Sequence, residues 1–251
     1  AGSLSKVGAA RPESSLMFAK FSPDGLKIAY VSEYNIYVED LATQAVKALT
    51  TDGHRRFING TFDWVYEEEF YCRDGFRWSA DGKSIAYWQI DAAETRDFMM
   101  INNTDSIYSF AVPVEYPKVG RNPSACKIGV VDIATSRTNW LNIPGDPKQH
   151  YIVRMEWIPG KSEILIQQLN RKQNQSKLMI CPTNGAPPSL LFSESDKAWI
   201  EIANVGDKYN VAFTHSFIWL ENGKSFLWTT ETDGWNHLYI IGLDGRKHFP
   251  V

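Results

Sequence analysis

The sequence predicts an all-β chain made of four short units of similar layout, the pattern of four-stranded β-propeller blades. Two observations predict this class: apolar and polar residues alternate with the period of strands, and a turn flanked by apolar runs recurs along the chain. A third is composition, because 43% hydrophobic residues and 9 tryptophans supply a large core rich in strand-forming side chains. We therefore predict that residues 1–251 form a single partial propeller domain.

Each unit begins with a strand that ends in an aromatic residue, followed by a tight turn and an apolar strand. The turns contain Asp-Gly, Asn-Gly or Pro-Gly, and the first two favour hairpins because they tolerate positive φ. They lie at residues 21–25, 78–82, 157–160 and 219–223. A further strand closes each unit, at residues 35–41, 127–133, 177–180 and 237–241. We place the blades at roughly 15–50, 57–143, 150–192 and 199–249.

The second unit contains an insertion, residues 91–125, which is rich in apolar and aromatic side chains. Loops of this length are uncommon in compact domains and are often functional. The composition predicts an inserted hairpin arm that packs on a partner. The alternative is an elaborated hairpin without a partner.

Charge and motif content exclude several classes of protein. A net charge of −3 provides no basic field for nucleic acid, and no apolar run is long enough for a membrane span. Three cysteines without a Cys-x-x-Cys motif argue against a complete disulfide framework. The five histidines lack metal-site spacing, and no Gly-x-Ser-x-Gly motif is present, so we predict no metal, no cofactor and no catalytic machinery in this chain. The Gly-Lys-Ser triplets, such as residues 82–84, lie in hairpin turns and lack the upstream glycine of a phosphate-binding loop.

The most informative segment is residues 62–70, where Glu67, Glu68 and Glu69 lie between aromatic and apolar residues. Adjacent carboxylates repel one another unless water or a cation compensates them. A carboxylate pair at the wall of a cavity can bind an ammonium group, because each N–H finds an oxygen. The alternative is a solvated acidic turn. The segment also allows a short helix over residues 63–70.

The run Asp63-Trp64-Val65-Tyr66-Glu67-Glu68-Glu69-Phe70 resembles the double-glutamate motif of the dipeptidyl peptidase IV family of serine exopeptidases. The resemblance extends over nearly the whole chain. It includes Val-Glu-Tyr-Pro-Lys-Val-Gly at residues 114–120, residues 168–174, and the Asp-Gly-Trp-Asn-His-Leu-Tyr run at residues 233–239, which is typical of bacterial members.

The resemblance implies an eight-bladed propeller followed by a C-terminal α/β-hydrolase domain. The catalytic Ser, Asp and His would lie beyond residue 251, so this chain alone should be inactive. By the same resemblance, Glu68 and Glu69 bind the free N-terminal ammonium of a peptide substrate, and Glu67 is the preceding, non-binding glutamate. Tyr66 and Phe70 are candidates for the walls of that pocket, with core packing as the alternative.

The family further implies release of Xaa-Pro or Xaa-Ala dipeptides, homodimerisation through the arm at 91–125, and export to the periplasm or secretion. A cytoplasmic location stays open, because the first residues of this sequence do not have the pattern of a signal peptide, and a leader that has been removed is the alternative. Three alternatives also stay open. These are a catalytically inactive propeller used as a protein-interaction scaffold, a relative that releases tripeptides, and an unrelated sugar-binding propeller, which the motif set disfavours.

Overall fold

The computed structural model describes residues 4–202 and 217–248. Residues 203–216 and 249, which belong to the predicted fourth blade, lie outside the described residues. The chain forms two compact units: one consists of residues 1–139 and 147–149, and the other of residues 140–146 and 150–251. Each unit is described separately.

The first unit opens with a 3-10 turn, η1 (Glu13–Ser15), and a four-stranded sheet. In this sheet the strands lie in chain order and every neighbouring pair is antiparallel. They are β1 (Met17–Phe21), β2 (Lys27–Ser32), β3 (Asn35–Asp40) and β4 (Val46–Ala48).

The second sheet is centred on β7, which pairs antiparallel with β5, β6 and β10. Its strand order is β11-β10-β7-β5, with β6 also paired to β7. The strands are β5 (Phe57–Asn59), β6 (Phe76–Trp78), β7 (Ser84–Asp91), β10 (Ala125–Asp132) and β11 (Thr138–Trp140). The one α-helix of the described chain, α1 (Trp64–Glu69), lies between β5 and β6 in the sequence.

The first two sheets share one hydrophobic core. It contains Val31 and Val38 from the first sheet and Phe76, Ile85 and Tyr87 from the second, all nearly inaccessible to solvent. Alternate residues of a strand face one side of its sheet, so each strand contributes its apolar set to this core. Burial of the Tyr87 ring also raises the pKa of its hydroxyl to about 12.

The turns that start the first two sheets have the same construction. Ser22 and Ser79 donate their hydroxyls to Asp24 and Asp81, at 2.6 and 2.7 Å. Each aspartate also accepts a backbone N–H two residues further on, and the glycine that follows it has φ near +70°. This Asx-type turn is the physical basis of the sequence repeat.

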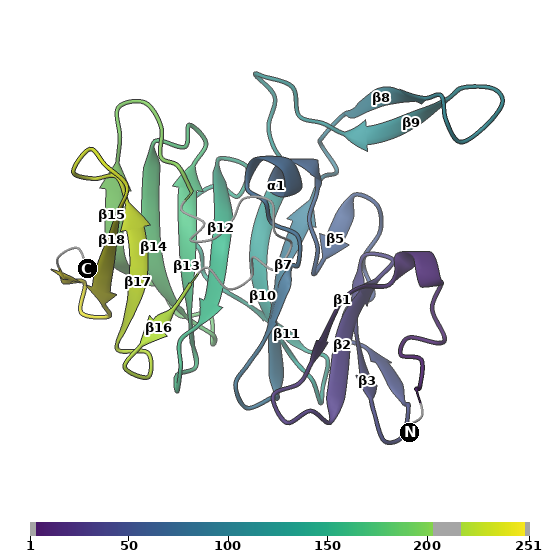
Figure 1. Cartoon of the computed structure of the whole chain (residues 1–251), viewed down its shortest axis with the longest axis horizontal. Coiled ribbons are helices and arrows are strands. Elements are labelled where there is room, and N and C mark those ends of the chain that lie inside the picture. Colours follow the sequence, from purple (N-terminus) through teal and green to yellow (C-terminus); the bar gives the residue numbers. More distant parts are fainter. Residues whose placement is uncertain (1–3, 203–216, 249–251) are drawn as a thin grey trace. The chain divides into compact units, whose positions relative to one another are not determined.

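The predicted arm at 91–125 contains a separate two-stranded antiparallel hairpin, β8 (Asp97–Asn102) paired with β9 (Phe110–Glu115). In Figure 1 this hairpin projects away from the sheet that contains β7. At its base, Arg55 and Arg56 form ion pairs of 2.6 to 3.8 Å with Asp97 and Glu115. The arm is therefore fixed to the sheet by charge pairs at its root.

The second unit contains two further four-stranded antiparallel sheets, each in chain order. The first consists of β12 (His150–Trp157), β13 (Glu163–Asn170), β14 (Gln175–Pro182) and β15 (Ser189–Ser195). The second consists of β16 (Trp219–Leu220), β17 (Ser225–Thr230), β18 (His237–Gly242) and β19 (Lys247–His248). A core that includes Leu165, Leu178, Phe226 and Trp228 joins them.

The predicted all-β class is confirmed, and so is the short helix near residues 63–70. All four predicted closing strands are present, as β3, β10, β14 and β18. The predicted blade boundaries and the single-domain organisation stay predictions.

Candidate functional site

The segment that carries α1 leaves and rejoins the second sheet at two glycines in contact. Gly60 donates its N–H to the carbonyl of Trp88 in β7, and Trp88 donates to the carbonyl of Gly75. A Cβ on Gly75 would lie 2.6 Å from the carbonyl carbon of Gly60, so no larger residue fits without movement of the backbone. Residues 61–74 thus form a loop whose two ends are held together against β7.

Helix α1 begins at Asp63, whose side chain caps it. Asp63 has extended dihedral angles, and its Oδ1 accepts the backbone N–H of Tyr66 at 3.3 Å. Its backbone carbonyl accepts the N–H of Glu67 at 3.1 Å. An aspartate at this position satisfies a donor that the first turn of a helix leaves unpaired. The Asp-Trp-Val-Tyr-Glu order therefore places the helix start at a defined residue.

The same Asp63 carboxylate connects α1 to the end of the inserted segment. Its Oδ2 accepts the hydroxyl of Ser124 at 2.5 Å, and Ser124 lies 3.4 Å from the hydroxyl of Thr95. All three side chains are buried. Burial raises the pKa of Asp63, and the hydrogen bonds from Ser124 and from the Tyr66 N–H oppose that shift.

The buried side of α1 packs on a cluster of aromatic side chains. Tyr66 and Phe70 are both buried, and their rings lie 5.5 Å apart in an edge-on arrangement. Tyr66 also stacks on Phe62 at 5.5 Å, and Phe62 contacts Trp88 at 5.2 Å. These contacts correspond to the core-packing alternative. A role for Tyr66 and Phe70 as walls of a substrate pocket stays a prediction.

The three glutamates at the carboxyl end of α1 differ in exposure. The Glu67 side chain is 33% exposed, the Glu68 side chain is 51% exposed, and Glu69 is also exposed. Burial raises the pKa of Glu67, the guanidinium of Arg73 lowers it, and the neighbouring Glu68 charge raises it further. Within residues 4–202 and 217–248, Glu69 makes no ion pair.

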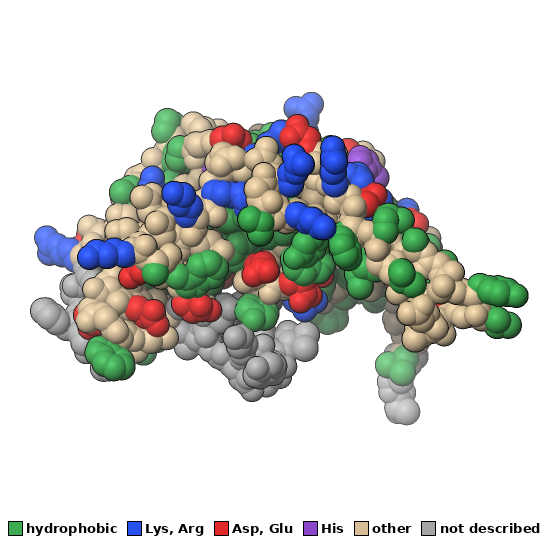
Figure 2. All heavy atoms as spheres, turned by 90° about the horizontal axis from the view of Figure 1, so that it is seen from above, with side chains coloured by type: hydrophobic (Ala, Val, Ile, Leu, Met, Phe, Trp, Pro, Cys, Tyr) green, Lys and Arg blue, Asp and Glu red, His purple; other side chains and the backbone are tan. Residues whose placement is uncertain are grey.

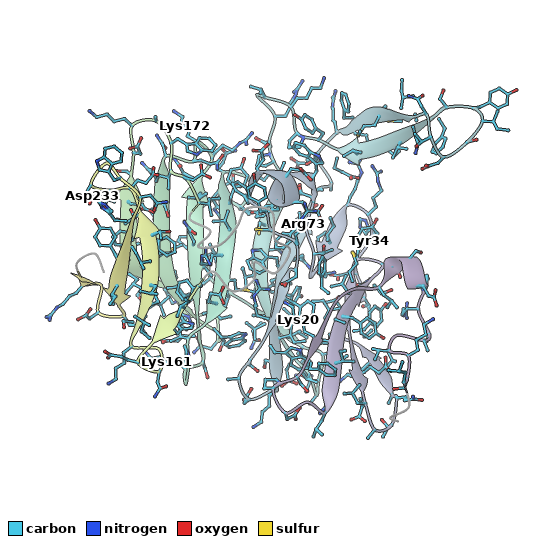
Figure 3. All side chains as sticks on the ribbon, viewed as in Figure 1. Lys20, Tyr34, Arg73, Lys161, Lys172 and Asp233 are labelled. Carbon is cyan, nitrogen blue, oxygen red and sulfur yellow. The ribbon has the colours of Figure 1, made fainter. Side chains whose placement is uncertain are left out.

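The chain turns sharply after the helix. Tyr71 has φ of +54°, which is unusual for a bulky residue, and Cys72 donates its N–H to the carbonyl of Tyr66 at 2.9 Å. This turn brings Arg73 back to the helix, where it lies 3.7 Å from Glu67 Oε2 and 4.0 Å from Glu68 Oε1. Figure 3 labels Arg73 close to α1.

This arrangement can bind a cation. Glu68 and Glu69, which we call the ammonium socket, are adjacent carboxylates at the negative end of a short helix, so a cation relieves both their mutual repulsion and the helix dipole. They project from a helix whose start is capped and whose underside is packed. A small, positively charged group with several N–H donors matches these oxygens.

A second aromatic cluster joins α1 to the arm. Trp64 meets the edge of Tyr116 at 4.4 Å, and Tyr116 lies 5.9 Å from Phe98 of β8. The helix thus contacts the C-terminal part of the inserted segment at Tyr116 and Ser124, and these two residues in turn contact its N-terminal part. The sequence did not reveal Arg73 or Ser124 as parts of the site, because both reach it through a turn and a long-range contact that no motif encodes.

The described residues, 4–202 and 217–248, offer little other site chemistry. Within this range no cluster of three His, Cys, Asp or Glu side chains could hold a metal ion. None of the helices in the described part is long and apolar enough to cross a membrane. Cys72, Cys126 and Cys181 form no disulfide within the described ranges, and burial raises the pKa of the Cys181 thiol to about 12.

Fold and site together define the class: an all-β chain of antiparallel sheets that carries a short helix with adjacent glutamates. The profile of the dipeptidyl peptidase IV (DPP IV) N-terminal region matches residues 3–251. The chain therefore belongs to this family, as the sequence motifs predicted.

Individual relatives agree with this assignment. The chain is 27% identical over 197 residues to the inactive dipeptidyl peptidase 10 of Rattus norvegicus, covering 76% of this chain and 25% of that protein. It is 25% identical over 241 residues to the dipeptidyl aminopeptidase B of Saccharomyces cerevisiae, covering 93% and 29%.

A solved structure is similar over nearly the whole chain. The crystal structure of Porphyromonas gingivalis dipeptidyl peptidase 4 matches with a TM-score of 0.82 and 27% identity, covering 94% of this chain and 32% of that one. The chain thus spans between a quarter and a third of the length of the relatives named here.

Proposed function

We propose that this chain is the substrate-gating, N-terminus-recognising propeller of a serine dipeptidyl aminopeptidase. In this proposal Glu68 and Glu69 bind the free ammonium of a peptide. The observation that carries it is the exposure of both carboxylates on a helix that is capped by buried Asp63 and packed on Tyr66. A site held in this way loses little entropy when it binds its ligand.

The ammonium socket would act as a ruler. A hydrolase domain would supply the nucleophile and the oxyanion hole, at a fixed distance from the socket. Only the bond two residues from the N-terminus would then reach the nucleophile, because positioning governs the rate of the chemical step. Release of Xaa-Pro and Xaa-Ala dipeptides belongs to the same proposal, with the choice of the second residue made by the hydrolase domain.

The test is hydrolysis of Gly-Pro-chromophore by the full-length protein, with the peptide amine either free or acetylated. We expect cleavage of the free amine only. The double variant Glu68→Ala/Glu69→Ala should lose several kcal/mol of transition-state stabilisation, at least ~100-fold in kcat/KM. Glu13→Gln is the matched control, because it also removes an exposed carboxylate, but one that pairs with Lys6 in the N-terminal segment and lies outside α1.

A second candidate is a catalytically inactive propeller that serves as a protein-interaction scaffold. This candidate is supported by the similarity to the relative from Rattus norvegicus, which is named an inactive dipeptidyl peptidase. Full-length protein that binds free-amine peptides without cleaving them would support the scaffold. Release of three residues at a time would instead support the tripeptidyl-releasing relative.

The arm is proposed as a homodimer interface. Large apolar side chains are exposed along β8 and β9, among them Phe98, Met99, Met100, Ile101 and Phe110. In Figure 2 hydrophobic side chains appear in separate patches on this projection and at its far end. Exposed apolar patches mark interaction sites, and a second copy of the chain would cover them. A periplasmic or secreted location is proposed on the family resemblance alone, and fractionation of the native host tests it.

A further inference from the structure

Arg73 has no role in the double-glutamate motif, yet it is the positive charge nearest the ammonium socket in the described chain. Its Nη2 lies 4.0 Å from Glu68 Oε1 and its Nη1 lies 3.7 Å from Glu67 Oε2. The turn at Tyr71, with its positive φ, places it there. A hydrogen bond also holds the Arg73 backbone, because its carbonyl accepts the hydroxyl of Thr61 at 3.5 Å.

The Arg73 guanidinium acts on the socket through its charge rather than through hydrogen bonds. Separations of 3.7 and 4.0 Å exceed hydrogen-bond length, and the side chain is 54% exposed. A guanidinium carries five N–H donors in a planar fork that fits a carboxylate. Arg73 therefore offsets one of the three glutamate charges and presents donors to a ligand at the socket.

We propose that Arg73 determines specificity for the first side chain of the bound peptide, favouring a carboxylate and disfavouring a second cation. This inference rests on the proposed function. When the peptide ammonium binds Glu68, the first Cα is one bond from that nitrogen, so the first side chain lies well within the ~10 Å screening length of Arg73. Without Arg73, three glutamates would face the peptide uncompensated and would favour Lys or Arg there.

The test measures kcat/KM of the full-length protein for three chromogenic peptides, Asp-Pro, Asn-Pro and Lys-Pro. In Arg73→Gln we expect the ratio of kcat/KM for Asp-Pro to kcat/KM for Lys-Pro to fall about fivefold or more, mainly through KM. The variant removes two interactions, the attraction of Arg73 for the peptide Asp and its repulsion of the peptide Lys, and each exposed charge contact is worth up to ~1 kcal/mol. Arg73→Lys should retain most of the ratio. The effect should shrink in ~0.5 M salt. Arg246→Gln, an exposed arginine that pairs with Asp244 in the second unit, is the matched control.

An unchanged ratio in Arg73→Gln overturns the inference. The free and acetylated forms of each peptide separate this failure from that of the proposed function. If acetylated peptides react as well as free ones, the ammonium socket is wrong and the inference fails with it. If the free amine is required but the ratio does not move, only the inference fails. Should the protein prove inactive, dissociation constants for the same three peptides give the same comparison.

Discussion

Asp63 caps the helix that carries Glu68 and Glu69, and its replacement should loosen that helix. Asp63→Ala removes the cap on the Tyr66 N–H, which costs about 0.5–2 kcal/mol. It also leaves the buried Ser124 hydroxyl without its 2.5 Å acceptor, at about 1–3 kcal/mol, with Thr95 as a partial substitute. We expect a total loss of about 2–4 kcal/mol, a large share of the stability of a typical domain.

The pH dependence of Asp63→Asn isolates the charge. Burial raises the pKa of Asp63 above its ordinary value of 3.8. The associated stability is therefore fully present below 3.8 and is lost as the pH rises through the folded-state pKa. Asparagine still caps the helix but does not ionise, so Asp63→Asn should gain stability relative to the wild type as the pH rises from 4 upward, at about 1.4 kcal/mol per unit of pKa shift.

The assay is urea-induced unfolding followed by tryptophan fluorescence, at several pH values from about 4 to 8, with amide hydrogen exchange of residues 64–69 as a local readout. A loss below about 0.5 kcal/mol in Asp63→Ala would contradict the role of Asp63 as helix cap and hydrogen-bond acceptor. A difference between Asp63→Asn and the wild type that does not vary with pH would refute the assigned role of burial.

Two further predictions concern packing and assembly. Gly60→Ala should cost about 2–4 kcal/mol of unfolding free energy, because φ is +76° and a Cβ would lie 2.7 Å from Ile36 Cγ1. Gly25→Ala should cost only about 1 kcal/mol, because Gly25 has a similar φ of +71° but open space around it. Thermal unfolding compares the two variants, and equal losses would contradict the packing argument. Ile101→Asp should convert a dimer of the full-length protein to a monomer without loss of fold, because the Ile101 side chain is 72% exposed on the arm. Sedimentation measures the mass of the variant, and an unchanged mass would contradict the arm as the dimer interface.

The sequence predicted those parts of the fold that depend on local chemistry. The turns at Asp24-Gly25 and Asp81-Gly82 could be recognised because the aspartate and glycine determine the backbone conformation within a few residues. The apolar strands that follow them were recognisable from their alternation. The short helix was harder to predict, because six residues with two aromatics and one β-branched side chain have no strong helical propensity. It is stabilised by the Asp63 cap and by burial of Tyr66 instead.

The candidate site was only partly predictable for the same reason. Adjacent glutamates indicate a cation site by their chemistry, and family motifs single out Glu68 and Glu69. The bond from Ser124 to Asp63 joins residues 61 apart in the sequence, and no local pattern encodes it. The contact between Arg73 and Glu68 depends on the left-handed backbone conformation of Tyr71. A bulky aromatic residue rarely adopts this conformation, so the residue type does not predict it.

Binding of the peptide N-terminus by Glu68 and Glu69 is best tested by the cleavage of free and acetylated Gly-Pro-chromophore, with the full-length wild type compared with Glu68→Ala/Glu69→Ala. We expect the wild type to cleave only the free amine and the double variant to lose at least ~100-fold in kcat/KM. Cleavage of both peptides at equal rates, or a double variant that matches the wild type, would contradict the assignment of these two glutamates as the site that holds the peptide N-terminus.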